Sequence, residues 1–534
     1  MKRYDYIVVG AGSSGCVLAN RLTENGRFQV LLLEAGPDIE SFWVKAPAGV
    51  PFLYGNPNVN WMNSTLPEPH LGGRQIFQPR GKLMGGSSAI NGMVYVRGNR
   101  GDYDAWRAEG NAGWSAAEVL PYFRSMEANL DFHDEYHGDS GPLRVSKSRY
   151  KVAVIDAFVD AAVSAGHFRN PDPNGAAQEG VAHYQLSIDG GMRNSAARAF
   201  LKPARSRRNL TIIDRATVNS LLFDGNRVTG VCYTRHGQSH EVRANEVLLS
   251  GGAINSPQVL MLSGIGPPEQ LRAAGIQVRR DLPGVGQNLQ DHLSIAVNYR
   301  MQSGMSLNAA LSGLGRYISG ARYLFMKSGP LTLGTSQACV FMRTEPAANL
   351  PDIQISYRAW SFDFLNGQLK IHAYPGVQAA AILLHPRSRG SIALDREDPA
   401  RAPLIRMNYL SDPADLAGLI RGIKAMRAIA ATPEYRRIMV REQTPGAERI
   451  SDEALGDYIR QYAQSVYHPV GTCKMGQGTD AVVNERLCVR GVPGVRVVDA
   501  SIMPTITSAN TNAPCMLIGE RAAALILEDA GAIS

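Results

Sequence analysis

The sequence has few cysteines, and none of them stands in a pair. Its six cysteines are scattered between residues 16 and 515 without a CxxC spacing. This pattern builds neither a zinc site nor a disulfide framework, and free thiols are typical of a reducing compartment. The sequence therefore predicts no metal site and a cytoplasmic protein.

Long apolar runs and dense charge are also missing. No apolar stretch approaches the ~20 residues of a membrane span, and the best candidate, 513–527, is interrupted by Glu520 and Arg521. Charged residues make up 19%, less than the ~25% of ordinary proteins. The net charge of +8 is spread along the chain, and its densest basic runs, 205–208 and 436–437, are short and lack interleaved aromatics. This is not typical of a protein that binds nucleic acid. A basic balance is compatible with loose contact with an anionic membrane.

Glycine is abundant, and at the start of the chain it forms an ordered motif. The pattern predicts a buried strand over 4–9, a turn Gly-Ala-Gly-Ser-Ser-Gly over 10–15, a helix over 16–22 and a second buried strand over 30–33. This is a complete βαβ unit. It predicts the binding site of a dinucleotide.

Each motif residue in this unit has its own physical role. Gly10 permits the tight turn, Gly12 lets the backbone approach a pyrophosphate at the helix N-terminus, and Gly15 allows close packing of helix and strand. Glu34 follows Gly15 by nineteen residues and would accept the ribose hydroxyls. It would repel a 2′-phosphate. The motif alone does not separate NAD from FAD.

The rest of the chain predicts an α/β protein of two or three domains. Prolines rule out a long helix between Glu34 and residue 80, and the glycine- and serine-rich stretch 80–95 predicts a loop whose backbone faces a ligand. Residues 300–464 alternate strands and helices, which predicts a mixed sheet with covering helices. The other expected strands are 210–214, 220–223, 228–233, 246–249, 352–357 and 495–500, and the expected helices are 152–165, 196–201, 415–430, 513–529 and one from about 254.

Three further motifs are given structural interpretations. His133 and His137 are four residues apart, but Glu135 is misplaced for HExxH and the glycines that follow predict a loop. The stretch 85–89 lacks the closing glycine of a nucleophile elbow, which argues against a serine hydrolase. His292 closes a Gln-Asp-His motif, and we expect it to stabilise a turn near the cofactor rather than to perform chemistry.

Several stretches together resemble one family, the glucose-methanol-choline (GMC) flavoprotein oxidoreductases. They occur in the family's order: the N-terminal unit, 81–106, 252–267, 282–292, 468–476 and 497–521. The resemblance implies FAD as the cofactor, and it is strongest to bacterial choline, aliphatic alcohol and sorbose dehydrogenases. It also implies an α/β fold with a Rossmann-like FAD-binding domain, of the kind shared with glutathione reductase, and a mixed-sheet substrate-binding domain. The implied FAD-binding pieces are 1–150, 192–299 and 465–534, and the implied substrate pieces are 151–191 and 300–464.

The resemblance also implies which residues hold FAD. Residues 91–94 would line the isoalloxazine, Val218 would meet the adenine, and Asp499 with Ala500 would approach the pyrophosphate and ribityl chain. Some members attach FAD through a histidine where this chain has Ile90, so we expect non-covalent FAD. The full implied set is Gly10, Gly12, Ser13, Ser14, Gly15, Glu34, Ala35, Gly81, Met84, Gly86, Ser87, Asn91, Gly92, Met93, Val94, Val218, Asp499, Ala500, Asn510 and Thr511.

Two residues are expected to carry the chemistry of alcohol oxidation. Removal of a hydroxyl proton needs a base, and histidine suits this task near neutral pH. His468 lies in a loop bounded by proline and glycine, and by the resemblance it is the base. Asn512 matches the family's second active-site position, where its amide would donate to the alkoxide.

The sequence leaves several alternatives open. The main hypothesis is an FAD-dependent alcohol dehydrogenase or oxidase, but a hydroxynitrile lyase with non-redox FAD, or a flavin-binding module without catalysis, would share these motifs. The acceptor is a quinone, a redox protein or O₂, and the resemblance favours a dehydrogenase. Trp360, Phe362 and Phe364 indicate an apolar roof over the substrate. The sequence does not name the alcohol or the oligomeric state.

Overall fold

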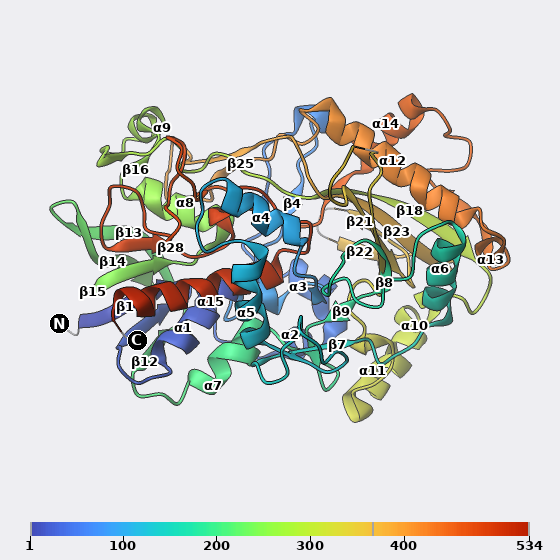
Figure 1. The fold of residues 1–534 in the computed structure, drawn as a ribbon, viewed down its shortest axis with the longest axis horizontal. Coiled ribbons are helices and arrows are strands. Elements are labelled where there is room, and N and C mark those ends of the chain that lie inside the picture. Colours follow the sequence, from blue (N-terminus) through green and yellow to red (C-terminus); the bar gives the residue numbers. More distant parts are fainter. Residues whose placement is uncertain (1–2, 346, 366–367, 532–534) are drawn as a thin grey trace.

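Two seven-stranded sheets lie along the long axis of the molecule (Figure 1). The computed structural model describes residues 3–345, 347–365 and 368–531. The first sheet lies on the side of the N-terminus, and the second lies at the opposite end under α12 (Pro413–Ala430). The fold class expected from the sequence, an α/β fold with a Rossmann-like unit and a second sheet, is confirmed.

The first sheet is built on the N-terminal unit. β1 (Arg3–Val9) pairs in parallel with β2 (Val30–Leu33), and α1 (Ser13–Thr23) connects them. β1 also pairs in parallel with β15 (Gln238–Leu249). The strand order is β12-β2-β1-β15-β14-β13, with β28 beside β15. The other strands are β12 (Leu210–Ile213), β13 (Ala216–Asp224), β14 (Arg227–Arg235) and β28 (Val495–Val497).

Parallel pairing brings the carboxyl ends of three strands to one edge. In the register, Val9 lies beside Leu33 and Leu249, so the loops that begin at Gly10, Glu34 and Ser250 meet there. A side chain at Gly10 would lie 2.6 Å from the Ser250 carbonyl oxygen, which explains why the turn needs glycine. Ligands bind at this edge in open α/β sheets.

The last long helix, α15 (Asn512–Asp529), packs against α1 and closes the unit. The hydroxyl of Ser14 donates to the carbonyl of Cys515 at 2.6 Å. Farther along, the Arg21 guanidinium pairs with the buried Glu520 carboxylate at 2.9 Å. The two helices therefore begin side by side at the edge where the dinucleotide is expected.

The second sheet has the strand order β26-β18-β23-β20-β19-β8, with β27 (Gln464–Ser465) beside β18. All of its ladders run antiparallel. The alternation of strands and helices predicts a mixed sheet instead, and the difference arises because periodicity carries no information on strand direction. The strands are β8 (Gly180–His183), β18 (Leu293–Met301), β19 (Ala338–Met342), β20 (Ile353–Arg358), β23 (Gly376–Leu383) and β26 (Met439–Thr444).

Two of the predicted domain boundaries fall inside strands of the second sheet: the one at residue 465 divides β27, and the other is at residue 300. The boundary expected at residue 300 falls inside β18, which begins at Leu293 and belongs wholly to the second sheet. The change of sheet therefore comes before Leu293. A smaller sheet combines three strands of the N-terminal piece, β5 (Val94–Tyr95), β6 (Glu127–Asn129) and β7 (Leu143–Lys147), with β9 (Gln185–Leu186) in the order β5-β9-β7-β6.

The expected helices are largely in place. The stretch 152–165 forms α6 (Ala153–Ser164), and 196–201 forms a π-helical turn, Ala197–Leu201, that continues into α7 (Lys202–Ala204). Between Glu34 and residue 80 the helices are short, as the prolines predict. The remaining helices are α2 (Phe42–Lys45), α3 (Val50–Tyr54), α4 (Arg100–Ala108), α5 (Ala116–Met126), α8 (Gly252–Leu262), α9 (Pro268–Ala273), α10 (Asn308–Leu311), α11 (Gly315–Met326), α13 (Pro433–Arg436) and α14 (Asp452–Tyr462).

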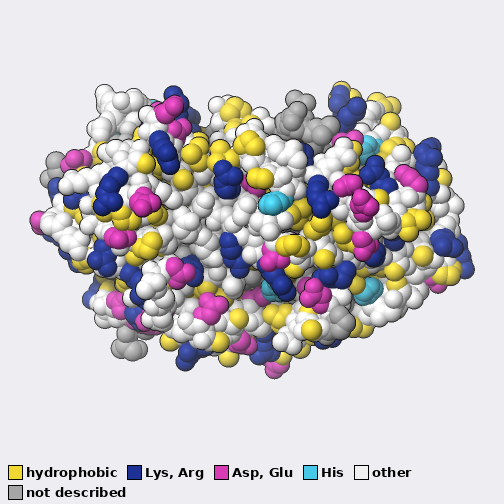
Figure 2. Space-filling model, turned by 90° about the horizontal axis from the view of Figure 1, so that it is seen from above, with side chains coloured by type: hydrophobic (Ala, Val, Ile, Leu, Met, Phe, Trp, Pro, Cys, Tyr) yellow, Lys and Arg dark blue, Asp and Glu magenta, His cyan; other side chains and the backbone are white. Residues whose placement is uncertain are grey.

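The helices, the cysteines and the surface charges concern the expected membrane contact, reducing compartment and absence of a nucleic-acid partner. Within the described ranges, no helix is both long enough and apolar enough to cross a membrane. All six cysteines are free. Figure 2 shows basic and acidic side chains interspersed over one face of the molecule rather than gathered in a stripe.

Candidate active site

One large cavity, of about 2910 Å³, is lined by the carboxyl edge of the first sheet and by strands of the second. Its lining includes Val9 and Leu33 at the ends of β1 and β2, and Ser294 and Ala296 on β18. Pockets for drug-sized ligands take ~300–1,000 Å³. This cavity has room for a dinucleotide together with a substrate.

Most of the residues that the sequence assigns to FAD line this cavity. Two do not. Gly15 lies under the turn, where a Cβ would come within 1.9 Å of the Gly10 carbonyl oxygen, so its role is close packing. Met84 is buried in the core. Those that do line the cavity are Gly10, Gly12, Ser13, Ser14, Glu34, Ala35, Gly81, Gly86, Ser87, Asn91, Gly92, Met93, Val94, Val218, Asp499, Ala500, Asn510 and Thr511.

The cavity wall fits a dinucleotide in shape and in unsatisfied polar atoms. A Cβ at Gly12 would meet nothing closer than the Ser250 carbonyl oxygen at 3.9 Å, so the space beside it is open to a ligand. A Cβ at Gly86 would lie 2.7 Å from the Gly12 Cα, so two glycine loops approach each other here. Among the described residues, the buried Ser250 hydroxyl and the Asn510 carboxamide oxygen have no hydrogen-bond partner. Both residues line the cavity.

Glu34 lies at the cavity edge and fixes the turn. Its two carboxylate oxygens accept from the backbone N–H of Ala11 and of Gly36, each at 2.8 Å. Burial raises the pKa of Glu34 to about 7, although these bonds and the charge of Lys82 act against it. A carboxylate has about four acceptor sites, so it keeps sites for ribose hydroxyls.

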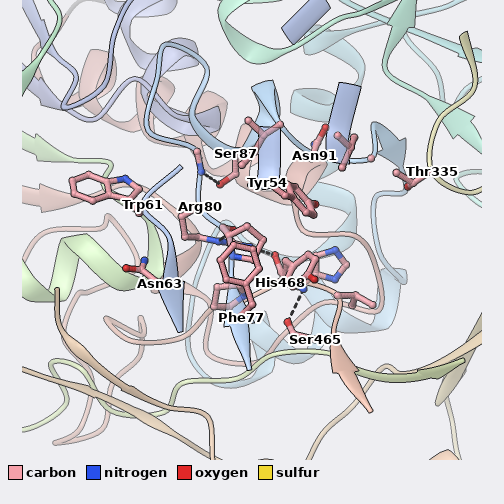
Figure 3. A pocket seen from close by; sticks show the side chains of 18 of the residues that line it. Tyr54, Trp61, Asn63, Phe77, Arg80, Ser87, Asn91, Thr335, Ser465 and His468 are labelled. Atoms are coloured by element: carbon pink, nitrogen blue, oxygen red, sulfur yellow. Dashed lines mark hydrogen bonds between the residues drawn. The ribbon is translucent and has the colours of Figure 1, made fainter. Parts of the chain in front are cut away.

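The loop that carries His468 is held by a buried carboxylate. Asp291 accepts the backbone N–H of His468 at 2.6 Å and the hydroxyls of Ser465 and Tyr409. Tyr467, just before His468, has a φ of 69°, a conformation that costs of order 1–3 kcal/mol and persists only where the surroundings impose it. In Figure 3 His468 projects into the cavity beside Arg80 and Tyr54.

The hydrogen bonds of two histidines determine which nitrogen of His468 carries the lone pair. His292 Nε2 lies 3.1 Å from the Leu384 carbonyl oxygen, which can only accept, so Nε2 carries the hydrogen. Burial lowers the pKa of His292 to about 3, so the ring is neutral and its Nδ1 is an acceptor. His468 Nδ1 lies 3.0 Å from that atom and must donate. The neutral His468 therefore has its lone pair on Nε2.

Burial lowers the pKa of His468 well below its usual value, and the charge of Arg80 acts in the same direction. His468 is therefore neutral at pH 7 and can accept a proton. The sequence alone predicts a pKa of His468 near neutrality. In the structure the pKa is lower, because the side chain is almost fully buried.

Asn510 and Asn512 take different positions. Asn510 Nδ2 lies 3.2 Å from His468 Nε2, whereas the Asn512 carboxamide oxygen accepts from the Ser13 hydroxyl at 2.8 Å. Asn512 is the first residue of α15, and its side chain joins that helix to α1. Asn510, assigned to the cofactor from the sequence, is thus the carboxamide beside His468.

The sequence does not predict the contact between His292 and His468. The two residues are 176 positions apart and meet because β18 pairs with β27, with Leu293 opposite Ser465. His292, expected from the sequence to stabilise a turn, touches the proposed base directly. No local pattern predicts this register.

The predicted apolar roof is present in part. Trp360 and Phe362 stack with ring centroids 4.8 Å apart, and both line the cavity. The side chain of Phe364 lies outside the described residues. These two rings make this part of the cavity wall apolar.

The motif around His137 forms a buried ionic cluster away from the cavity. Its Nδ1 lies 2.7 Å from Glu127 and its Nε2 lies 2.7 Å from Asp172, and Glu127 also pairs with Arg97. Burial by itself would lower the pKa of His137, but the two carboxylates outweigh it and raise the pKa to about 9. Asp134 completes a group that could in geometry hold a metal. An imidazolium between two carboxylates has no lone pair to offer one.

This cluster predicts a pH-dependent loss of stability. A pKa raised from 6.5 to about 9 gives stability that is fully present below pH 6.5 and is lost as the pH rises through 9, worth about 3 kcal/mol. His137→Gln should therefore be destabilising at pH 6 and much less so at pH 9.5. Urea unfolding of both proteins across this range measures the difference, and a gap independent of pH would contradict the assignment.

Comparisons with known proteins agree with this site. Residues 4–294 and 386–519 match the N-terminal and C-terminal parts of the GMC oxidoreductase family. The chain is 42% identical to an alcohol dehydrogenase [acceptor] of Pseudomonas putida, over 98% of this chain and 96% of the relative. It is 39% identical to an oxygen-dependent choline dehydrogenase of Photobacterium profundum, over 98% and 93% of the two chains.

A solved structure gives the same result. The crystal structure of pyridoxine 4-oxidase from Mesorbium loti superposes with a TM-score of 0.88 at 32% identity, covering 97% of this chain and 98% of that chain. The family matches cover the first sheet and the loops that carry the glycine turn and His468. The chain therefore belongs to the GMC oxidoreductase family, a family whose typical cofactor is FAD.

Proposed function

We propose that the protein oxidises an alcohol to an aldehyde or ketone with bound FAD, and that His468 removes the hydroxyl proton. The observation that carries this proposal is the tautomer of His468, which leaves a lone pair on Nε2 of a neutral ring in the cavity. The names of the relatives, an alcohol dehydrogenase and a choline dehydrogenase, support the same class of substrate.

The chain's own residues would hold FAD along the cavity. The turn at Gly10–Gly15 and the N-terminus of α1 would receive the pyrophosphate, Glu34 the ribose, Val218 the adenine, and residues 91–94 the isoalloxazine. When bound, FAD supplies the acceptor for the hydrogen and two electrons of the substrate C–H bond. Ile90 lines the cavity and has no nucleophile, so we propose that FAD is held without a covalent bond and is released by acid.

The proton transfer follows from the polar groups around the substrate hydroxyl. His468 Nε2 accepts the hydroxyl proton while its Nδ1–H remains bonded to His292, which stabilises the imidazolium that forms. The Asn510 amide donates to the alkoxide oxygen, and the buried Arg80 adds positive charge near the same atom. Asn512 also lines the cavity, and its bond to Ser13 uses only the carboxamide oxygen. We favour Asn510 over Asn512 for this role because Asn510 lies beside His468 Nε2.

An alcohol panel without oxygen tests the proposal. Aliphatic, aromatic, sugar and amino alcohols are added to the yellow protein under anaerobic conditions, and at least one should bleach the flavin absorbance. A hydroxynitrile lyase or a non-catalytic flavin module does not require bleaching. No bleaching by any class, together with cleavage of a cyanohydrin, would favour the lyase.

The assignment of Asn510 has its own prediction. Asn510→Ala should lower the rate of flavin reduction by about 10²-fold, because it removes one donor to the alkoxide while the base remains. Asn512→Ala is the matched control. Its flavin should be reduced much faster than that of Asn510→Ala, because the Asn512 side chain is hydrogen-bonded to Ser13. Anaerobic stopped-flow reduction measures both. The opposite order would return the role to Asn512.

The acceptor is proposed from similarity. We favour a dehydrogenase that passes electrons to a quinone or a redox protein over an oxidase. Turnover with an artificial quinone should exceed turnover in air. Stoichiometric hydrogen peroxide formed at an equal rate would reverse this preference.

A further inference from the structure

α11 turns its apolar side toward solvent. The apolar residues 314, 317, 318, 321, 324 and 325 recur at the spacing of one helical face. Leu314 is 76% exposed, Ile318 64% and Phe325 88%. Such a stripe normally faces the protein core. Here the helix projects from the lower edge of the molecule in Figure 1.

The opposite side of α11 fixes this orientation. The Ser319 hydroxyl donates to the Ala310 carbonyl at 2.9 Å, and the buried Tyr323 ring meets Phe42 edge-on with centroids 5.7 Å apart. A Cβ at Gly315 would lie 2.0 Å from the Ala309 carbonyl oxygen. The helix is therefore seated on the body by its small and polar residues, and its apolar stripe cannot turn inward.

Exposed apolar side chains also lie on the short helices against which α11 is seated. Trp43 on α2 and Phe52 on α3 stack with centroids 3.9 Å apart, and Trp43 also contacts Phe42, which meets Tyr323. Half of the sixteen exposed large hydrophobic side chains in the described residues lie on these two short helices and in the segment of α11. We define these side chains as the docking face: Trp43, Phe52, Leu314, Tyr317, Ile318, Leu324, Phe325 and Met326.

The charges of the segment that contains α11 have one sign. Residues 302–344 contain four basic residues and no acidic residue. Arg316, Arg322 and Lys327 lie on or beside α11 and are exposed. In the part of the chain that the structure describes, none of these three forms a salt bridge. An apolar helical face flanked by unpaired cations and aromatics has the composition of a helix that lies on an anionic bilayer.

We propose that the docking face binds the surface of an anionic lipid bilayer, with α11 lying in its headgroup region. A second copy of the chain fits less well, because a twofold contact would oppose the same three cations. Trp43, Phe52, Arg316 and Tyr317 also line the cavity, so docking would turn the cavity opening toward the bilayer. An apolar acceptor or alcohol dissolved in the lipid would then reach the site directly.

Vesicle binding of the FAD-loaded protein tests this proposal. The wild-type protein is sedimented with vesicles of phosphatidylcholine alone and with vesicles of phosphatidylcholine and phosphatidylglycerol in equal parts. Binding should be much stronger to the anionic vesicles and should fall with added salt. The combined variant Ile318→Ser, Leu324→Ser and Phe325→Ser should lower the partition coefficient at least ~10-fold. Arg322→Gln with Lys327→Gln should weaken only the preference for anionic vesicles.

The controls use equally exposed residues elsewhere. Val440 and Ile450 are also exposed and hydrophobic, and their serine variant should bind vesicles like wild type. All variants should keep FAD and reduce a soluble artificial acceptor at the wild-type rate, because none of the substituted residues lines the cavity. Absence of vesicle binding, equal binding to neutral vesicles, or a dimer in sedimentation that the triple variant dissociates would each overturn the proposal.

Discussion

Replacing His468 by alanine is expected to lower the rate of flavin reduction by an alcohol about 10²–10⁴-fold, the usual contribution of a positioned general base. FAD content and apparent Tm should stay near wild type, because the loop is held through the backbone N–H of residue 468 by Asp291 rather than through the imidazole. Anaerobic stopped-flow reduction with α-deuterated alcohol measures the chemical step. Reduction by His468→Ala at nearly the wild-type rate would remove the proposed base.

The pH profile adds a second criterion. The base must be neutral to act, so the rate should rise with pH through the pKa of His468 and then stay level. Because burial lowers that pKa, the rise should lie below pH 6.5 in wild type and be absent in His468→Ala. His292→Ala removes the acceptor that fixes the tautomer, and it should move this rise while retaining measurable reduction. A severe loss confined to His292→Ala would relocate the base.

Gly12→Val is expected to weaken FAD retention by about 10–10²-fold, because overpacking a tight contact costs roughly 1–3 kcal/mol and the valine would occupy the space of the pyrophosphate. The backbone tolerates the change, since Gly12 has a φ of −77°. The protein itself also has room for the first side-chain atom, since the atom nearest to a Cβ at position 12 is 3.9 Å away. The folded protein should therefore survive and lose its colour.

FAD per chain after gel filtration, and the affinity on adding FAD back, are the measurements. Gly12→Ala is the graded control and should retain more FAD than the valine variant. Circular dichroism must show the wild-type fold in both. Stoichiometric FAD in Gly12→Val would show that the turn does not receive the pyrophosphate.

The N-terminal unit and the type of cofactor could be predicted because their signals are local. Period-two and period-3.6 patterns define β1, α1 and β2, and three glycines at fixed spacing leave few other structures for the turn. The same reasoning does not decide between Asn510 and Asn512. They lie two residues apart in one loop, and the choice depends on where α15 begins and on the contact with Ser13.

Other features depend on pairing between distant segments. His292 meets His468 through the register of β18 and β27, and Asp291 reaches the same loop by that route. The direction of the ladders in the second sheet and the entry into β18 at Leu293 are likewise set by tertiary pairing. Hydrophobic patterns state which faces are buried, but they do not state which strand lies opposite.

The contact between α1 and α15 has a consequence for how the protein is made. Ser13 and Asn512 are 499 residues apart, and ribosomes add ~5–20 residues each second. The glycine turn would therefore leave the ribosome about 25–100 s before the helix that completes it. During synthesis the apolar side of α1 has to be protected in another way, for example by a chaperone, and FAD can be captured stably only when the polypeptide is almost finished.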